Sequence, residues 1–214
     1  MHKYRIRYSR GKEARFISHL DFMRTMTRAL RRTRLPLQYS QGFNPHAVLS
    51  VAAPLSVGVT SEGECMDVGF ETEVDPQLAL KQLNDALPLG ILALRMHPAD
   101  GLRPFKDIAA ASYRVAFSCD KAPNLEGFLS QDTIEVDKRS KKGLRRVDIR
   151  PMIGCIEPEQ DGKLTIWRMR LQAGEPSLKP ELVLSALEQQ QALGIRQVQV
   201  HRLALYFNDG TEVV

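Results

Sequence analysis

Residues 3–8 alternate between large hydrophobic and basic side chains, which is the period of a half-buried β-strand. Tyr4, Ile6 and Tyr8 fall on one face of that strand. The alternating positions Lys3, Arg5 and Arg7 are all basic. The pattern therefore predicts a strand with one hydrophobic and one basic face.

An amphipathic helix is predicted from Ser18 to about Thr33, ahead of the helix-breaking Pro36. Ser18 is a typical N-cap residue, and Asp21 follows three residues later, where a capping-box partner stands. Helical spacing predicts a side that faces the core, formed by Leu20, Met23, Thr27 and Leu30. The opposite side carries a row of arginines, Arg24, Arg28, Arg31 and Arg32.

The segment up to residue 97 completes a pattern of four strands and two helices. The sequence predicts a polar linker at 37–46 and two strands at 47–57 and 64–71. A helix at 75–87, which begins with Asp75 and Pro76, and a closing strand at 91–96 are predicted to follow. The order strand–helix–strand–strand–helix–strand is that of a ferredoxin-like βαββαβ unit.

The same order of elements is predicted a second time toward the C-terminus. Strands are expected at 113–117, 133–136, 163–171 and 198–207, and helices at 125–129 and 182–193. The fold class is therefore α+β, with two tandem ferredoxin-like units and a basic insertion, about 138–162, in the second. The predicted boundaries are 1–97 for the first unit, 98–111 for a linker and 112–214 for the second unit.

Composition places the chain among globular proteins. It has 214 residues, 43% of them hydrophobic and 26% charged. Its apolar runs fall well short of the ~20 residues that a membrane span needs, and its N-terminus lacks the apolar region of a secretory signal. The three cysteines are odd in number and widely separated, so reduced thiols are expected. We therefore expect a cytoplasmic protein with no membrane partner.

The net charge of +5 is unevenly distributed along the chain. Residues 1–50 hold eleven lysines and arginines against two acidic residues, and 138–150 hold seven against one. Concentrated positive charge is typical of proteins that bind polyanions, because neutralised phosphates release their counterions. Lacking apolar periodicity, 138–146 are predicted to form a mobile arm that contacts phosphate. A solvated basic surface with no partner remains the simplest alternative.

No catalytic or cofactor motif accompanies these clusters. The sequence has no nucleophile elbow, phosphate-binding loop, dinucleotide fingerprint or zinc-type Cys/His spacing. We expect no metal and no cofactor, and no catalytic residue is assigned. His19, in the first turn of the predicted helix, and His46, after the polar linker, are the only candidates for a general base. Each is equally explained as a hydrogen-bonded structural histidine.

The predicted nucleic-acid contacts combine the basic residues with the polar linker. Phe43 could stack on a base and Asn44 could read a base edge, although Phe43 could also anchor the loop in the core. The full set of predicted contacts is Arg5, Arg7, Arg15, Arg24, Arg28, Arg31, Arg32, Gln41, Phe43, Asn44, His46, Lys138, Arg139, Lys141, Lys142, Arg145, Arg146 and Arg150.

Several motifs resemble those of the radical-SAM-linked protein family, a domain of unknown function. They are Arg15-Phe16-Ile17-Ser18-His19-Leu20-Asp21, Tyr39-Ser40-Gln41-Gly42-Phe43-Asn44-Pro45-His46, Pro54-Leu55-Ser56-Val57-Gly58 with Ser61-Glu62-Gly63-Glu64, Lys141-Lys142-Gly143 with Val147-Asp148-Ile149-Arg150-Pro151, and Pro176-Ser177-Leu178-Lys179-Pro180-Glu181. Members of that family occur alone or fused behind a cobalamin-binding radical SAM enzyme. Because this chain lacks the radical SAM Cys-x-x-x-Cys-x-x-Cys cluster, the resemblance implies a separate protein with such an enzyme as its partner.

Together these observations favour a non-catalytic protein that binds tRNA or rRNA and presents it to a radical SAM modifying enzyme. Two alternatives stay open. The predicted architecture also resembles the CRISPR repeat-processing endoribonucleases, in which a histidine base would cleave RNA. Asn208-Asp209-Gly210-Thr211 is, however, a poor match to their glycine-rich loop. The other alternative is an interaction module that docks the radical SAM enzyme through its basic surfaces without RNA.

Overall fold

The computed structural model describes residues 2–140, 143–159 and 164–214. The chain has the expected mixed α+β architecture and divides into two compact units. Unit 1 comprises residues 1–108 and 204–214, and unit 2 comprises 109–203. Of the residues predicted as a linker, 98–108 belong to unit 1 and 109–111 to unit 2, and the last residues of the chain join unit 1. No helix of the described residues is long and apolar enough to cross a membrane.

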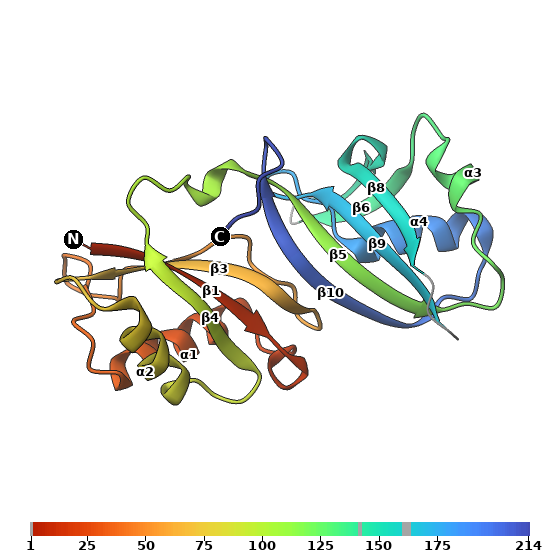
Figure 1. Ribbon diagram of the computed structural model, residues 1–214. Helices are drawn as coiled ribbons and strands as arrows, with labels where there is room; N and C mark the ends of the chain where they lie inside the picture. The colour runs from red at the N-terminus through yellow and green to blue at the C-terminus, as the bar shows by residue number, and fades with distance from the viewer. Residues whose placement is uncertain (1, 141–142, 160–163) are drawn as a thin grey trace. The chain divides into compact units, whose positions relative to one another are not determined.

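Unit 1 is an antiparallel sheet with two helices on one side (Figure 1). Its strands lie in the order β4-β1-β3, and β2 pairs with β3. Its elements are β1 (His2–Arg10), α1 (His19–Arg32), β2 (Leu49–Val51), β3 (Thr60–Phe70), α2 (Pro76–Ala86) and β4 (Ile91–Pro98), with single 3-10 turns at Lys12–Ala14 and Phe105–Asp107.

The core of unit 1 lies between this sheet and its helices. The predicted hydrophobic face of β1 is confirmed, because Tyr4, Ile6 and Tyr8 are all buried. Tyr8 stacks on Phe22 of α1, with ring centroids 5.1 Å apart, and so joins the first strand to the first helix.

Helix α1 begins as the sequence predicts and buries Leu30 as expected, but the rest of its buried side is formed by other side chains. Asp21 donates its backbone N–H to Ser18 Oγ at 3.2 Å, and that hydroxyl donates to the Asp21 carboxylate at 2.7 Å. The predicted core position of Leu20 is wrong, since its side chain is 66% exposed. At about 100° per residue, Leu20 falls on the arginine side of the helix. The buried side is formed by Phe22, Met26, Ala29 and Leu30.

Unit 2 combines an antiparallel sheet with a separate two-stranded sheet. The main strands lie in the order β10-β5-β9-β8, and β6 pairs only with β7. The elements are β5 (Ile108–Ser118), α3 (Leu125–Leu129), β6 (Glu135–Ser140), β7 (Gly143–Asp148), β8 (Ile153–Glu159), β9 (Thr165–Gln172), α4 (Pro180–Gln191) and β10 (Arg196–Phe207), with a 3-10 turn at Arg150–Met152.

The predicted basic arm is a β-hairpin, and this corrects the sequence analysis. Its register runs from Glu135 opposite Asp148 to Ser140 opposite Gly143. A strand, β8, also lies within the segment that was predicted as the insertion. The two strands of the hairpin were not predicted because most of their side chains are charged, so the sequence shows no hydrophobic alternation there. Strand pairing itself uses backbone hydrogen bonds, which leave no trace in the side-chain pattern.

Candidate nucleic-acid interface

Helix α1 presents its arginines on the side opposite its buried face. Arg24, Arg28, Arg31 and Arg32 are all exposed, and they fall within an arc of about 100° when residues are placed 100° apart. Arg24 pairs with Asp21 at 3.1 Å, in an exposed contact between neighbouring turns. Below, "arginine row" refers to these four arginines. The row is a cationic ridge on a helix that the core holds in place.

The C-terminal half of the arginine row contacts two neighbouring segments. Arg31 donates from Nε to the hydroxyl of Tyr39 at 3.1 Å, and its guanidinium carbon lies 5.5 Å from the centre of the Tyr39 ring. Arg32 donates to the backbone carbonyl of Ala86 at the end of α2. These contacts orient the two guanidinium groups, one toward the segment after α1 and one toward α2.

Residues 40–46 form a loop that closes on itself. Tyr39 and Ala47 form a β-bridge at its base. Ser40 donates its backbone N–H to the carbonyl of His46 at 2.8 Å, and the backbone N–H of His46 donates to Ser40 Oγ at 3.1 Å. The same hydroxyl lies 2.8 Å from His46 Nδ1. Three contacts between one serine and one histidine therefore hold the ends of the loop together.

Phe43 stands at the tip of this loop with its ring fully exposed. The preceding Gly42 has φ +128°, a conformation that side chains rarely adopt, so a glycine is suited to the turn that carries the phenyl group outward. Gln41, Asn44 and His46 are exposed as well. Of the two roles considered for Phe43, the structure excludes the core anchor and leaves an aromatic ring open to a partner.

Three basic residues near the N-terminus have internal partners. Arg5 was predicted to contact nucleic acid, but it is only 2% exposed and binds the carboxylate of Asp67 through Nε at 2.8 Å, so this assignment is corrected. Arg7 pairs with Glu212 at 2.6 Å. Arg15 lies over the ring of Phe16, 4.7 Å from its centre, and remains partly exposed.

The basic residues of the hairpin belong to unit 2. Lys138 and Arg139 lie in β6, and Lys141 and Lys142 fall outside the described residues. In β7 the side chains of Arg145 and Arg146 are exposed, and Arg146 pairs with Glu135 at 3.0 Å. Arg150 donates to the carbonyl of Leu129 at 3.0 Å and is half-buried. The structure thus groups the arginine row with loop 40–46 in unit 1 and places the hairpin in the other unit.

The two candidate general bases occupy different settings. His19 is the exposed first residue of α1. His46 is exposed too, but its Nδ1 is engaged by the hydroxyl of Ser40. Within 2–140, 143–159 and 164–214, no three His, Cys, Asp or Glu side chains gather as a metal site would require.

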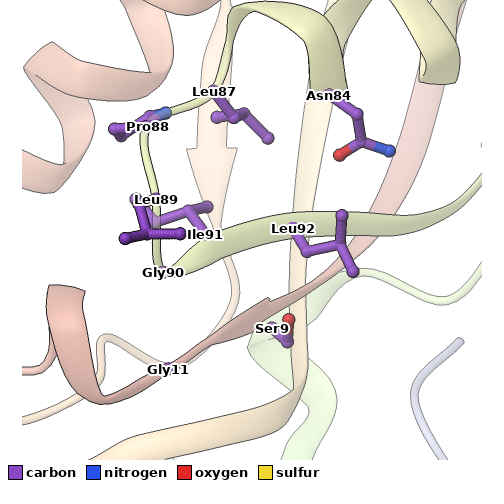
Figure 2. Close-up of a pocket in the computed structure, with 9 residues that line it drawn as sticks. All are labelled: Ser9, Gly11, Asn84, Leu87, Pro88, Leu89, Gly90, Ile91 and Leu92. Atoms are coloured by element: carbon purple, nitrogen blue, oxygen red, sulfur yellow. The ribbon is translucent and has the colours of Figure 1, made fainter.

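A hollow of about 430 Å³ lies where β1 ends and β4 begins (Figure 2). Its lining residues are all uncharged: Ser9, Gly11, Asn84, Leu87, Pro88, Leu89, Gly90, Ile91 and Leu92. The amide of Asn84 is already engaged, since it donates to the carbonyl of Ala93 at 2.9 Å and accepts from its N–H at 2.8 Å. An uncharged lining does not suit phosphate, so this hollow is not part of the candidate interface.

Sequence reasoning missed the residues that position the interface. Tyr39 orients Arg31, and Ser40 closes the loop, yet neither was a candidate. Arg10 was also missed: it is buried and donates to the carbonyls of Ala14, Arg15 and Ile17. A tyrosine eight residues after an arginine carries no recognisable pattern, because the chain turns between the two.

Solved structures with a similar fold include three complexes. The first is a Cbf5–Nop10–Gar1 complex, with a TM-score of 0.55 and 10% sequence identity. The second is an archaeal box H/ACA sRNP Nop10–Cbf5 complex, with a TM-score of 0.50 and 10% identity. The third is an H/ACA RNP bound to a substrate RNA containing 2′-deoxyuridine, with a TM-score of 0.50 and 11% identity. Each similarity covers 93% of this chain, which spans about half of the matched protein, at 47%, 46% and 46%. At these identities the similarity shows the fold alone.

No curated protein matches the chain in sequence. A family model does match, over residues 3–180, which is most of the chain. The chain therefore belongs to the family described as uncharacterized proteins conserved in bacteria (DUF2344).

Proposed function

We propose that this protein binds RNA through the arginine row of α1 and loop 40–46. One observation carries the proposal: a fully exposed Phe43 stands on a closed loop whose base is attached to the arginine row by the contact between Arg31 and Tyr39. Cationic side chains beside an exposed aromatic ring are what a protein needs to hold a nucleic-acid strand by its phosphates and stack on one of its bases.

The two parts of the surface make different contributions. Each guanidinium group that neutralises a phosphate releases counterions, so the arginine row supplies affinity that falls with salt. The phenyl ring of Phe43 needs a base that is out of its helix, because a paired and stacked base offers no free face. The substrate is therefore an RNA with at least one unpaired nucleotide, such as the loop of a tRNA or rRNA.

The similar folds are consistent with this role. Two of the solved structures of similar fold are described as H/ACA ribonucleoproteins, and one of these two is bound to a substrate RNA. The two longest motifs by which the chain resembles the radical-SAM-linked family, 15–21 and 39–46, include the start of α1 and the closed loop. The motifs on which the family resemblance rests therefore overlap in part with the proposed RNA surface.

We further propose that this protein has two ferredoxin-like domains and works together with an RNA-modifying enzyme. Each unit is a ferredoxin-like domain, a reading supported by the strand orders β4-β1-β3-β2 and β10-β5-β9-β8. The protein presents tRNA or rRNA to a cobalamin-binding radical SAM enzyme that modifies it. Support for that enzyme comes from the family resemblance, and the RNA surface is argued independently of it.

Fluorescence anisotropy with labelled bulk tRNA tests the RNA surface. The affinity of R24E/R28E for RNA should fall by about tenfold or more. Because each lost contact with a single strand reduces the slope of log K against log salt by ~0.7, the two substitutions should make that slope less steep by about 1.4. The matched control is K12E/R95E, which makes the same change of charge at two exposed positions of unit 1. Unchanged affinity of R24E/R28E, or an equal loss in the control, would contradict the proposal.

A further inference from the structure

Phe16, two residues before the N-cap of α1, is a second aromatic residue that the fold leaves open to solvent. It is 67% exposed, and Leu20 in the first turn of α1 is 66% exposed. Phe16 stands at the N-terminal end of the arginine row, whereas the contact between Arg31 and Tyr39 attaches loop 40–46 to the C-terminal end. An exposed aromatic ring is therefore associated with each end of the row.

The backbone around Phe16 is held in place by a buried arginine. Arg10 is 2% exposed and donates from Nε to the carbonyl of Ala14 at 3.0 Å. Its Nη2 donates to the carbonyls of Arg15 and Ile17, each at 2.8 Å. Ala14 is buried, and Ile17 packs against the core of unit 1. Because the residues on both sides of Phe16 are fixed from within, the backbone that carries the exposed ring loses little conformational freedom when a partner binds.

Arg15 places a cation against this ring. Its guanidinium carbon lies 4.7 Å from the centre of the Phe16 ring, and the residue is partly exposed. The carbonyl of Arg15 also accepts from the N–H of Gly58 at 2.7 Å, so the backbone that carries the guanidinium group is fixed as well. In a nucleic acid every flat base is joined to an anionic phosphate, and a positive charge beside an exposed aromatic ring matches both groups.

The charges that follow Phe16 along α1 indicate the same kind of partner. Leu20 is followed at intervals of four residues, or about 6 Å along the axis, by three members of the arginine row. Asp21, the acidic residue of the first turn, is already paired with Arg24 at 3.1 Å. Phe16 is thus continuous with a line of positive charge. That line favours a polyanion over an apolar protein segment, which would have to remove water from the guanidinium groups without neutralising them.

We propose that Phe16 is a second base-stacking site, which holds an unpaired base of the RNA next to a phosphate on Arg15. The inference rests on the proposed function and specifies its substrate further. Helix α1 has 14 residues and is about 21 Å long. A stacked strand advances by about 3.4 Å for each nucleotide, so about six nucleotides cover this length, and an extended strand needs fewer. The ligand is therefore a single-stranded stretch of several nucleotides that follows α1 and stacks one base on Phe16 and another on Phe43.

Crosslinking of the native protein tests this site without any variant. Ultraviolet light joins a uridine to an aromatic side chain on which it stacks, and mass spectrometry then identifies the peptide. Tryptic cleavage at arginine and lysine recovers Phe16 in peptide 16–24 and Phe43 in peptide 35–81. A bound single strand of about twelve uridines should crosslink to both peptides. Fragment ions should place the first adduct at Phe16, since Phe22 in the same peptide is only 2% exposed.

Variants at Phe16 separate stacking from a general apolar contact. F16A should lower the affinity for the same strand by about fivefold to more than a hundredfold, the range that stacking on one aromatic ring contributes. F16L keeps an apolar side chain but has no ring face, so it should lose nearly as much, whereas F16W keeps a ring and should retain the native affinity. The control is L20A, which truncates another exposed hydrophobic side chain at this end of α1 and should leave the affinity close to native.

The outcomes separate this inference from the function on which it rests. Crosslinks in peptide 35–81 alone, native affinity of F16A or F16L, or an equal loss in L20A overturns the second stacking site and leaves the arginine row and loop 40–46 standing as the RNA surface. No binding of any RNA strand by the native protein overturns the proposed function and the second stacking site with it.

Discussion

The hydroxyl of Tyr39 accepts a hydrogen bond from Nε of Arg31, and the Arg31 guanidinium group lies near the face of the Tyr39 ring, 5.5 Å from its centre. This pair joins α1 to the base of loop 40–46, since Tyr39 also forms a bridge with Ala47 across that base. The contact orients one arginine of the row and the loop that carries Phe43 together. The phosphate-binding and base-stacking parts of the proposed surface are therefore positioned by one interaction.

The first prediction concerns Phe43. Because its ring is fully exposed, F43A should leave the free energy of unfolding within about 0.5 kcal/mol of native. Stacking of a base on an aromatic ring contributes about 1–3 kcal/mol, so RNA affinity should fall by about fivefold to more than a hundredfold. Urea denaturation and fluorescence anisotropy measure the two effects. The control is L89A, which truncates another side chain that is 84% exposed; an equal loss of affinity there would contradict the stacking role.

The second prediction concerns the buried ion pair of Arg5 and Asp67. Arg5 bonds both carboxylate oxygens, at 2.8 and 3.3 Å, donates to the carbonyl of Arg103, and lies 4.2 Å from the centre of the Phe105 ring. R5M should lower the free energy of unfolding by about 1–3 kcal/mol, because the buried Asp67 carboxylate loses the hydrogen bonds of Arg5 and keeps only Lys3, at 2.8 Å, as a partner.

Urea denaturation of R5M, with R28M as the control, measures this cost. Arg28 is exposed, so R28M should stay within about 0.5 kcal/mol of native. Folded R5M should bind RNA as native protein does, whereas R28M should bind it more weakly. A stable R5M with weakened RNA binding would instead restore Arg5 to the RNA surface.

These residues show how far the sequence could predict the site. The spacing of arginines along α1 was enough to identify an exposed basic side, because helical geometry alone relates those positions. Alternation along β1 correctly separated its two faces. It could not show that the face with Arg5 is covered, since the groups around Arg5 are Asp67 and Phe105, which are distant in the sequence.

One other feature depended on contacts that no local pattern reports. The ends of loop 40–46 meet through Ser40 and His46, so the exposure of Phe43 follows from a closure that the spacing of residues does not reveal.

The third prediction concerns Asn84, whose amide bonds both backbone groups of Ala93. Ala93 is buried in β4, so N84A would leave its N–H and C=O without those partners. The free energy of unfolding should fall by about 2 kcal/mol. N84D keeps the acceptor but places a carboxylate oxygen against the Ala93 carbonyl in place of the donor, so it should be at least as destabilised as N84A. Urea denaturation measures the series, and faster hydrogen exchange at the Ala93 amide is the local readout. An N84A variant as stable as native would show that the amide contributes nothing.

The fourth prediction concerns the reactivity of the cysteines. Burial, with a smaller contribution from the charge of Glu64, raises the pKa of the Cys65 thiol to about 12. Cys155 is exposed, and Cys119 is intermediate. Because the thiolate is the reactive form, a disulfide reagent at pH 8 should modify Cys155 first and should reach Cys65 only after unfolding in urea. Rapid labelling of Cys65 in folded protein would contradict its buried, protonated state.

The same shift makes stability depend on alkaline pH. Between the ordinary thiol pKa of 9.0 and the folded value of about 12, the unfolded chain releases the Cys65 proton while the folded chain retains it. The contribution of this group to stability is therefore complete below pH 9 and decreases above it by about 1.4 kcal/mol per pH unit. Other groups also titrate there, so the measurement is the difference in unfolding free energy between native protein and C65V from pH 8 to pH 11. That difference should stay constant up to pH 9 and then shift in favour of C65V. A difference that does not change with pH would show that the Cys65 thiol is as acidic in the folded chain as in the unfolded one.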